Sequence, residues 1–151
     1  MITTLGDLNT MSQEQLDDLF RSAKSGPIPD GNSNGIAIVA PGTKVEGLAG
    51  RFIHWLAWRG KVFHASEGYL KNKITFLSIP AVKAKVYEDT SWFDGQPAII
   101  LDYSKTSFIA HKVRDEIREV APGLFLGQVY WGKKRIINFA LSFAATAAKA
   151  A

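Results

Sequence analysis

The alternation of apolar and polar residues along the chain predicts a sheet that is mostly antiparallel. Residues 82–87 place three apolar side chains on one face and three polar ones on the other. Residues 70–76 alternate in the same way. In residues 135–143, every second side chain lies on one face of the predicted strand: Arg135, Ile137, Phe139, Leu141 and Phe143. Strict alternation indicates one buried and one solvated face, which is typical of antiparallel neighbours.

Four further segments are expected to be strands. They are residues 35–40, 61–64, 97–103 and 124–131. The segment 97–103 is apolar on both faces until Asp102. Asp94-Gly95, which precedes it, is a hairpin signal, because this pair suits the backbone of a tight turn.

Helical periodicity predicts two or three helices. Residues 12–24 open with a capping box, Ser12 to Gln15, and carry apolar residues at helical spacing. Residues 45–58 carry an apolar stripe that includes two tryptophans. The segment 107–121 also has a helical pattern, in steps of four, four and three: Ile109, Val113, Ile117 and Val120.

These elements predict one α+β domain, mainly antiparallel β, spanning residues 1–151. The sheet should curl into a half-barrel or small barrel of the lipocalin or calycin type, with two or three helices packed on it. A chain of 151 residues suits a single core. Residues 1–11 and 144–151 carry no pattern that would pack, so both ends are expected to be flexible.

Composition and charge restrict the classes of partner. The chain has no cysteine and no signal-peptide pattern, so a cytoplasmic location is expected. Its net charge is +4, but the lysines and arginines are spread along the sequence rather than clustered. Nucleic acid is therefore an unlikely partner. A small apolar or anionic amphipathic ligand and an acidic membrane surface remain open, as does the oligomeric state.

Residues 31–35, Gly-Asn-Ser-Asn-Gly, fit the G-x-S-x-G pattern of hydrolase nucleophiles. That motif requires a strand before the serine and a helix after it. Here a proline-containing segment precedes Ser33 and an apolar β-type run follows it. We therefore expect a surface turn, and expect Ser33→Ala to change nothing.

The order of features over residues 29–132 resembles that of an uncharacterised family of small proteins. This family is named for a Gly-x-Trp-x-Gly motif, and Gly31-x-x-x-Gly35 has the corresponding glycine spacing. Ser33 stands where the family has tryptophan, which is a departure from its pattern. The resemblance implies a lipocalin-like β-structure.

Large aromatic residues are numerous for one domain and predict a ligand pocket. Pockets for small molecules are mostly apolar and aromatic, with a few placed polar groups. The polar end of this pocket is expected at Asp102, which the pattern pairs with Arg114 or Arg118. The predicted ligand-binding residues are Trp55, Trp58, Trp92, Asp102, Tyr103, Arg114, Arg118, Tyr130 and Trp131. The alternatives are a solid aromatic core and a structural ion pair at Asp102.

Three functions remain open on the sequence. The leading one is binding of a lipid-like or polyketide-like ligand in a cavity of the curled sheet. The second is an isomerase, cyclase or hydrolase using that cavity, with Asp102, Tyr103 or His111 as acid or base. The third is a membrane-surface or protein-interaction module. The three histidines lack metal-ligand spacing, so neither a metal nor a cofactor is expected.

Overall fold

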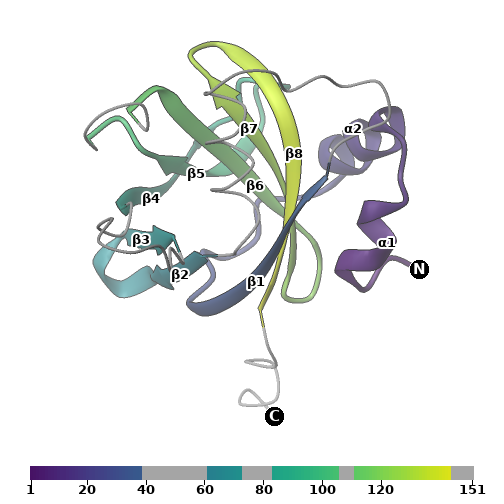
Figure 1. Cartoon of the computed structure of the whole chain (residues 1–151), viewed down its shortest axis with the longest axis horizontal. Helices are drawn as coiled ribbons and strands as arrows, with labels where there is room; N and C mark the ends of the chain where they lie inside the picture. The colour runs from purple at the N-terminus through teal and green to yellow at the C-terminus, as the bar shows by residue number, and fades with distance from the viewer. Residues whose placement is uncertain (39–60, 73–82, 106–110, 144–151) are drawn as a thin grey trace, which may run out of the picture.

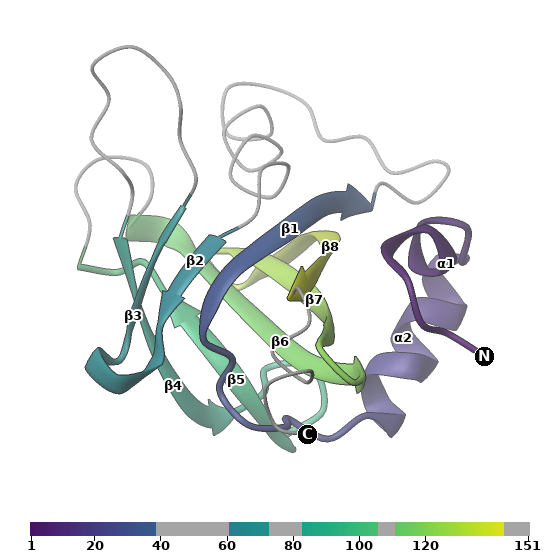
Figure 2. The ribbon, with the colours of Figure 1, turned by 90° about the horizontal axis from the view of Figure 1, so that it is seen from below.

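The computed structural model describes residues 1–38, 61–72, 83–105 and 111–143, which form a closed antiparallel β-barrel with two helices outside it (Figures 1 and 2). Each strand pairs with the next one along the chain, and the last pairs with the first. The strands are β1 (Gly31–Ile38), β2 (Lys61–His64), β3 (Tyr69–Asn72), β4 (Lys83–Thr90), β5 (Pro97–Asp102), β6 (Val113–Ala121), β7 (Leu124–Trp131) and β8 (Lys134–Phe143). The predicted curled antiparallel sheet is confirmed as a closed barrel.

Two helices, α1 (Leu5–Asn9) and α2 (Gln13–Ser22), cover the outer surface of one side of the barrel (Figure 1). The capping box at Ser12 and Gln15 is present, as predicted. Helix α1 corrects the expectation of a flexible segment 1–11, because Leu8 is fully buried beside Leu16 and Phe20. These helical side chains pack on the outer face of the strands, on Ile38, Leu124, Leu126 and Ala140.

The barrel interior is a second apolar core. Three of its phenylalanines lie near the β6–β7 turn, where Phe143 makes edge-to-face contacts with Phe63 and Phe125 at ring distances of 5.3 and 5.5 Å. The ring of Phe139 packs directly against the backbone of Gly127 in β7, and there is no room for a side chain there, since a Cβ on Gly127 would lie 2.3 Å from that ring. The other end of the barrel is the one from which the chain leads into residues 39–60, 73–82 and 106–110.

The prediction of a helix at 107–121 is wrong, because its described part forms strand β6. Val113 and Ile117 are four residues apart, and a spacing of four also satisfies the two-residue period of a strand. Both side chains face the barrel interior. The three-residue step to Val120, which favoured a helix, precedes an irregularity in the β6–β7 register between Glu119 and Ala121.

Other boundaries differ less from prediction. Strand β1 begins at Gly31, so the expected turn at 31–35 is part of a strand. A register shift between Val129 and Tyr130 lets Arg135 leave the face of Ile137 and pair with Asp17 of α2. The hairpin at Asp94-Gly95 is confirmed, and Gly95 has a φ of 74° there.

Several predictions lie outside the described residues: the helix at 45–58, the second half of the strand at 70–76, and the flexible segment 144–151. No helix in the described part of the chain is long and apolar enough to cross a membrane.

Candidate functional site

The predicted site residues separate onto two sides of the barrel wall. Asp102, Arg114 and Trp92 line a groove on the outer surface, whereas Tyr103 is fully buried in the interior core. Tyr130 contacts Trp92 on the outside at a ring distance of 5.4 Å, and Trp131 packs against the interior core. Trp55, Trp58 and His54 lie outside the described residues.

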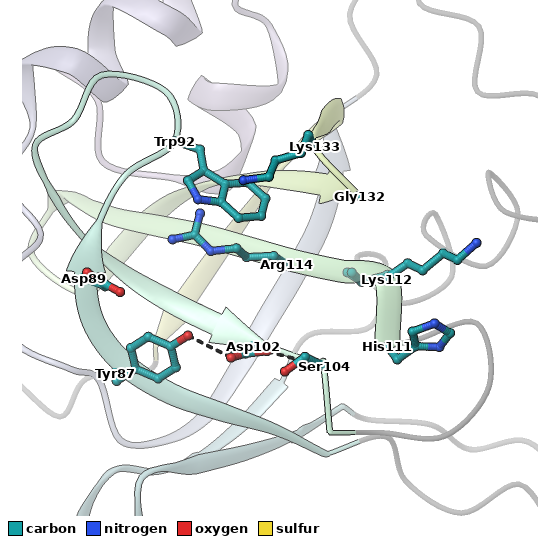
Figure 3. A pocket seen from close by; sticks show the side chains of 11 residues that line it. Tyr87, Asp89, Trp92, Asp102, Ser104, His111, Lys112, Arg114, Gly132 and Lys133 are labelled. Atoms are coloured by element: carbon teal, nitrogen blue, oxygen red, sulfur yellow. Dashed lines mark hydrogen bonds between the residues drawn. The ribbon is translucent and has the colours of Figure 1, made fainter.

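The outer groove has a volume of about 500 Å³ and lies across β4, β5 and β6 (Figure 3). Arg114 and Lys133 both lie over the ring of Trp92, at 4.0 and 4.4 Å from its centroid. The groove is lined by Tyr87, Asp89, Trp92, Asp102, Ser104, His111, Lys112, Val113, Arg114, Gly132 and Lys133. Figure 3 shows the acidic side chains Asp89 and Asp102 on one side of the groove, and the basic side chains Lys112, Arg114 and Lys133 on the other.

Asp102 is held by hydrogen bonds at the end of β5. Tyr87 Oη donates to Oδ2 at 2.8 Å, and the Ser104 backbone N–H donates to Oδ1 at 2.8 Å. Burial acts to raise the pKa of Asp102, but these hydrogen bonds and nearby Arg114 together hold it below its ordinary value. Burial, with the bond to Asp102, raises the pKa of Tyr87 to about 12, so Tyr87 remains a donor.

The two arginines proposed as partners of Asp102 bind other carboxylates. Arg114 is opposite Asp102 in the β5–β6 register, but its guanidinium binds Glu116 and the Thr90 carbonyl. Arg118 is fully buried and makes two hydrogen bonds to Asp94, at 2.6 and 2.7 Å.

Residues 114–119 carry mixed charges that would suit a solvated helix face, but in strand β6 Glu116 and Arg118 are fully buried. Glu116 also accepts hydrogen bonds from Ser91 Oγ and the Trp92 N–H, at 2.5 and 2.7 Å. Together with Arg118 and Asp94, it fastens the β4–β5 turn to the outside of β6. This role is structural.

A polar cluster inside the barrel consists of Lys61, Tyr103 and Asp115. Lys61 Nζ donates to Tyr103 Oη at 2.9 Å and lies 3.6 Å from Asp115 Oδ2. The side chains of Lys61 and Asp115 are 1% and 4% exposed. No described group donates a hydrogen bond to Asp115 Oδ1. Among the described residues, apolar side chains pack near the cluster, and Lys61 Nζ is 5.5 Å from the centroid of the Phe139 ring.

Burial shifts both charged members of the cluster toward their neutral forms. It raises the pKa of Asp115 to about 6, although the nearby Lys61 acts to lower it. It lowers the pKa of Lys61, against the opposing effect of Asp115. Perturbed acid–base groups in an enclosed space are typical of functional sites, although structural ion pairs show such shifts too.

Ser33 positions Lys61. The β1–β2 ladder ends at Asn32 and Val62, and the Ser33 side chain then replaces the next backbone pair. Its Oγ donates to the Lys61 carbonyl at 2.6 Å and accepts from the Lys61 N–H at 2.9 Å. Ser33 is 2% exposed and lies in a strand, so the expectation of a surface turn is wrong. Ser33 lies within strand β1, whereas the nucleophile of the G-x-S-x-G motif lies on a turn between a strand and a helix. This difference also argues against Ser33 as a nucleophile.

Lys61 and Asp115 were missed as site residues by the sequence reasoning. A signal existed for Lys61, since alternation along Lys-Val-Phe-His places it on the same face as Phe63. Asp115 was assigned to a helix, which hid its inward position between Val113 and Ile117. Ser104, His111 and Asp115 are residue types that could form a hydrolase triad, but Asp115 faces the interior and the other two line the outer groove.

Histidines and carboxylates give no metal site within the described ranges, where no group of three or more potential ligands lies together. His64 stacks on Tyr69 at a ring distance of 4.5 Å. This stacking places His64 in an aromatic contact on the outer surface of the barrel.

The sequence matches no described protein family and no curated protein. The fold is similar to the crystal structure of a protein from Thermomonospora curvata, with a TM-score of 0.56. The two chains are 17% identical, and the match covers 87% of each. This similarity shows a shared fold.

Proposed function

We propose that the barrel binds a small amphipathic ligand, with the ligand's polar group at Lys61, Tyr103 and Asp115. The observation that carries this proposal is the polar cluster itself. Burying a lysine and a carboxylate inside an apolar core costs several kcal/mol for each charged group. Such a cost is expected where the two groups have a function. The cluster supplies a cationic or neutral amine, a phenol and a carboxyl oxygen that still needs a donor.

The fold supports the same proposal. A barrel of this size has an interior that is either filled by side chains or able to hold one small ligand, as in lipocalins. The aromatic residues near the β6–β7 turn fill one end. The polar cluster lies toward the other end, where Trp131 packs against the core. The lipid-like or polyketide-like ligand expected from the sequence fits this division between apolar wall and polar group.

The similarity to the Gly-x-Trp-x-Gly family remains part of this proposal. Ser33, which stands at the motif's tryptophan position, touches the backbone of Lys61. The motif's central position would therefore lie beside the proposed site.

An enzyme acting on the same ligand is the second candidate function. It is favoured by the pKa of Asp115, raised to about 6, because a general acid or base works best near the ambient pH. Among the earlier catalytic candidates, Tyr103 belongs to this cluster. Asp102 and His111 lie on the outer groove, so they would not reach the same substrate.

Equilibrium dialysis with radiolabelled dodecanoate tests ligand binding. Lys61→Met should weaken binding by about 10- to 100-fold, since a hydrogen bond to a charged group is worth roughly 1.5–3 kcal/mol. Lys133→Met is the matched control, because it removes one cation from the outer groove. Saturable binding that depends on Lys133 and not on Lys61 would place the site outside the barrel. Absence of saturable binding of both dodecanoate and dodecanol would refute the proposal.

A further inference from the structure

We propose that the Lys61 amine captures the carbonyl carbon of an aldehyde or ketone ligand as a reversible imine inside the barrel. This inference rests on the proposed ligand-binding function and names the chemical class of the ligand. It would make the protein a covalent carrier of carbonyl compounds, or an enzyme that activates them.

Burial and two neighbouring aromatic rings favour the uncharged, nucleophilic form of the Lys61 amine. The side chain is 1% exposed, and rings of Tyr103 and Phe139 both have their centroids 5.5 Å from Nζ. A desolvated lysine loses much of its preference for the charged form, which is how imine-forming lysines become reactive. Burial indeed lowers the pKa of Lys61.

The geometry of Asp115 agrees with this assignment. Charge-assisted hydrogen bonds between an ammonium and a carboxylate are typically about 2.7–2.9 Å long. The separation of 3.6 Å between Nζ and Oδ2 is longer, so the pair is not a tight ion pair. Oδ1 accepts no hydrogen bond from a described group and is available to a ligand hydroxyl. A ligand carbonyl oxygen that approaches Nζ would therefore lie beside the carboxyl group of Asp115.

The chemistry balances without a redox partner. The neutral amine adds to the carbonyl carbon and one of its two protons moves to the oxygen, so that the C=O double bond becomes a carbinolamine C–OH. The protonated carboxyl of Asp115 then gives its proton to that hydroxyl, which leaves as water while the C=N bond forms. The nitrogen's remaining proton returns to the Asp115 carboxylate. Tyr103 Oη, 2.9 Å from Nζ, is placed to hydrogen-bond the oxygen or the nitrogen during this exchange.

Exposed lysines on the outer face of the same sheet provide an internal comparison. Lys71 and Lys83 face each other across β3 and β4, and both are exposed. They have the same primary amine but no enclosing apolar wall. Each unit by which burial lowers an amine's pKa raises its uncharged fraction at neutral pH about tenfold. Lys61 should therefore be modified before these lysines.

Reductive trapping tests the inference on the wild-type protein. The folded protein is incubated with substoichiometric decanal and cyanoborohydride at neutral pH, and peptide mapping locates the added decyl groups. The expected result is labelling of Lys61 at least about tenfold ahead of Lys71 and Lys83. Asp115→Asn should slow the labelling of Lys61, and it should remove the decline in rate expected above about pH 6. Dodecanoate should compete with decanal for Lys61 alone.

The outcomes separate this inference from the proposed function. Labelling of Lys71 and Lys83 with no labelling of Lys61 would overturn the imine, while dodecanoate binding that depends on Lys61 would leave the binding proposal intact. Equal labelling of Lys61 in folded and urea-unfolded protein would also overturn it, because the barrel would then add nothing to the amine's reactivity. Failure of both decanal labelling and dodecanoate binding would refute the two together.

Discussion

Replacing the buried pair Lys61 and Asp115 with apolar residues should leave the barrel at least as stable as the wild type. At 3.6 Å, two unit charges attract each other by about 5 kcal/mol at an effective dielectric constant of about 20. Taking the two charges out of water costs several kcal/mol for each ion, so the pair gains nothing net. We expect Lys61→Met/Asp115→Val to match the wild type or exceed it by about 1–4 kcal/mol.

The single variants should behave differently from the double variant. Asp115→Val leaves a buried amine without its carboxylate, which should cost about 3–5 kcal/mol if the amine stays charged. Lys61→Met should cost less near pH 5, because burial already raises the pKa of Asp115 to about 6 and the group is then mostly protonated.

Urea unfolding at pH 7 and pH 5, followed by far-ultraviolet circular dichroism, measures all four proteins. The slope of the unfolding free energy against urea should stay constant, so that midpoints can be compared. A double variant less stable than the wild type by more than about 3 kcal/mol would contradict the reasoning, because the pair would then contribute net stability despite the cost of burying its charges. Dodecanoate binding should be weakened in the double variant whatever its stability.

Three further predictions concern stability. Ser33→Ala should lower the free energy of unfolding by about 1–3 kcal/mol, because it leaves a buried backbone N–H and carbonyl unpaired; unchanged urea midpoints would show that they find other partners. Gly127→Ala should cost about 1–3 kcal/mol, since the added Cβ would lie 2.3 Å from the Phe139 ring, and a thermal melt at the wild-type temperature would show that the ring moves freely. In the wild type, Asp115 should lower stability by a few kcal/mol as pH rises from about 4 to about 6, because the folded state holds its proton longer than the unfolded state; Asp115→Asn should lack this decline, and an identical decline in that variant would assign it to another group.

Much of the barrel could be predicted because its strands alternate with a period of two. Residues 83–87 have one buried and one exposed face, and residues 137–143 place alternate side chains in the barrel interior, which is what their sequence indicates. Strand β6 could not be read in this way, because its outer face is also buried. Glu116 and Arg118 look like solvated helix positions until the β4–β5 turn folds over them.

The candidate site was less accessible to sequence reasoning. Tyr103 was identified from its position after an apolar strand, and it does face the interior. Lys61 and Asp115 are polar residues at inward positions, and a sequence pattern treats polar residues as outward by default. Only the closure of the barrel, which brings β2 opposite β6, places these two side chains together. Asp102 was expected to pair with an arginine, whereas Tyr87 and the Ser104 backbone hold it.

The most direct test of the central claim is to locate a bound ligand by nuclear magnetic resonance. Uniformly ¹³C-labelled dodecanoate is added to the protein, and nuclear Overhauser contacts from its chain to protein methyl groups are recorded. Binding inside the barrel predicts contacts to interior methyls, among them Val113, Ile117 and Val129, and loss of these contacts in Lys61→Met. Contacts confined to the Trp92 ring on the outer groove, or to Leu8 and Leu16 beneath the helices, would contradict the account.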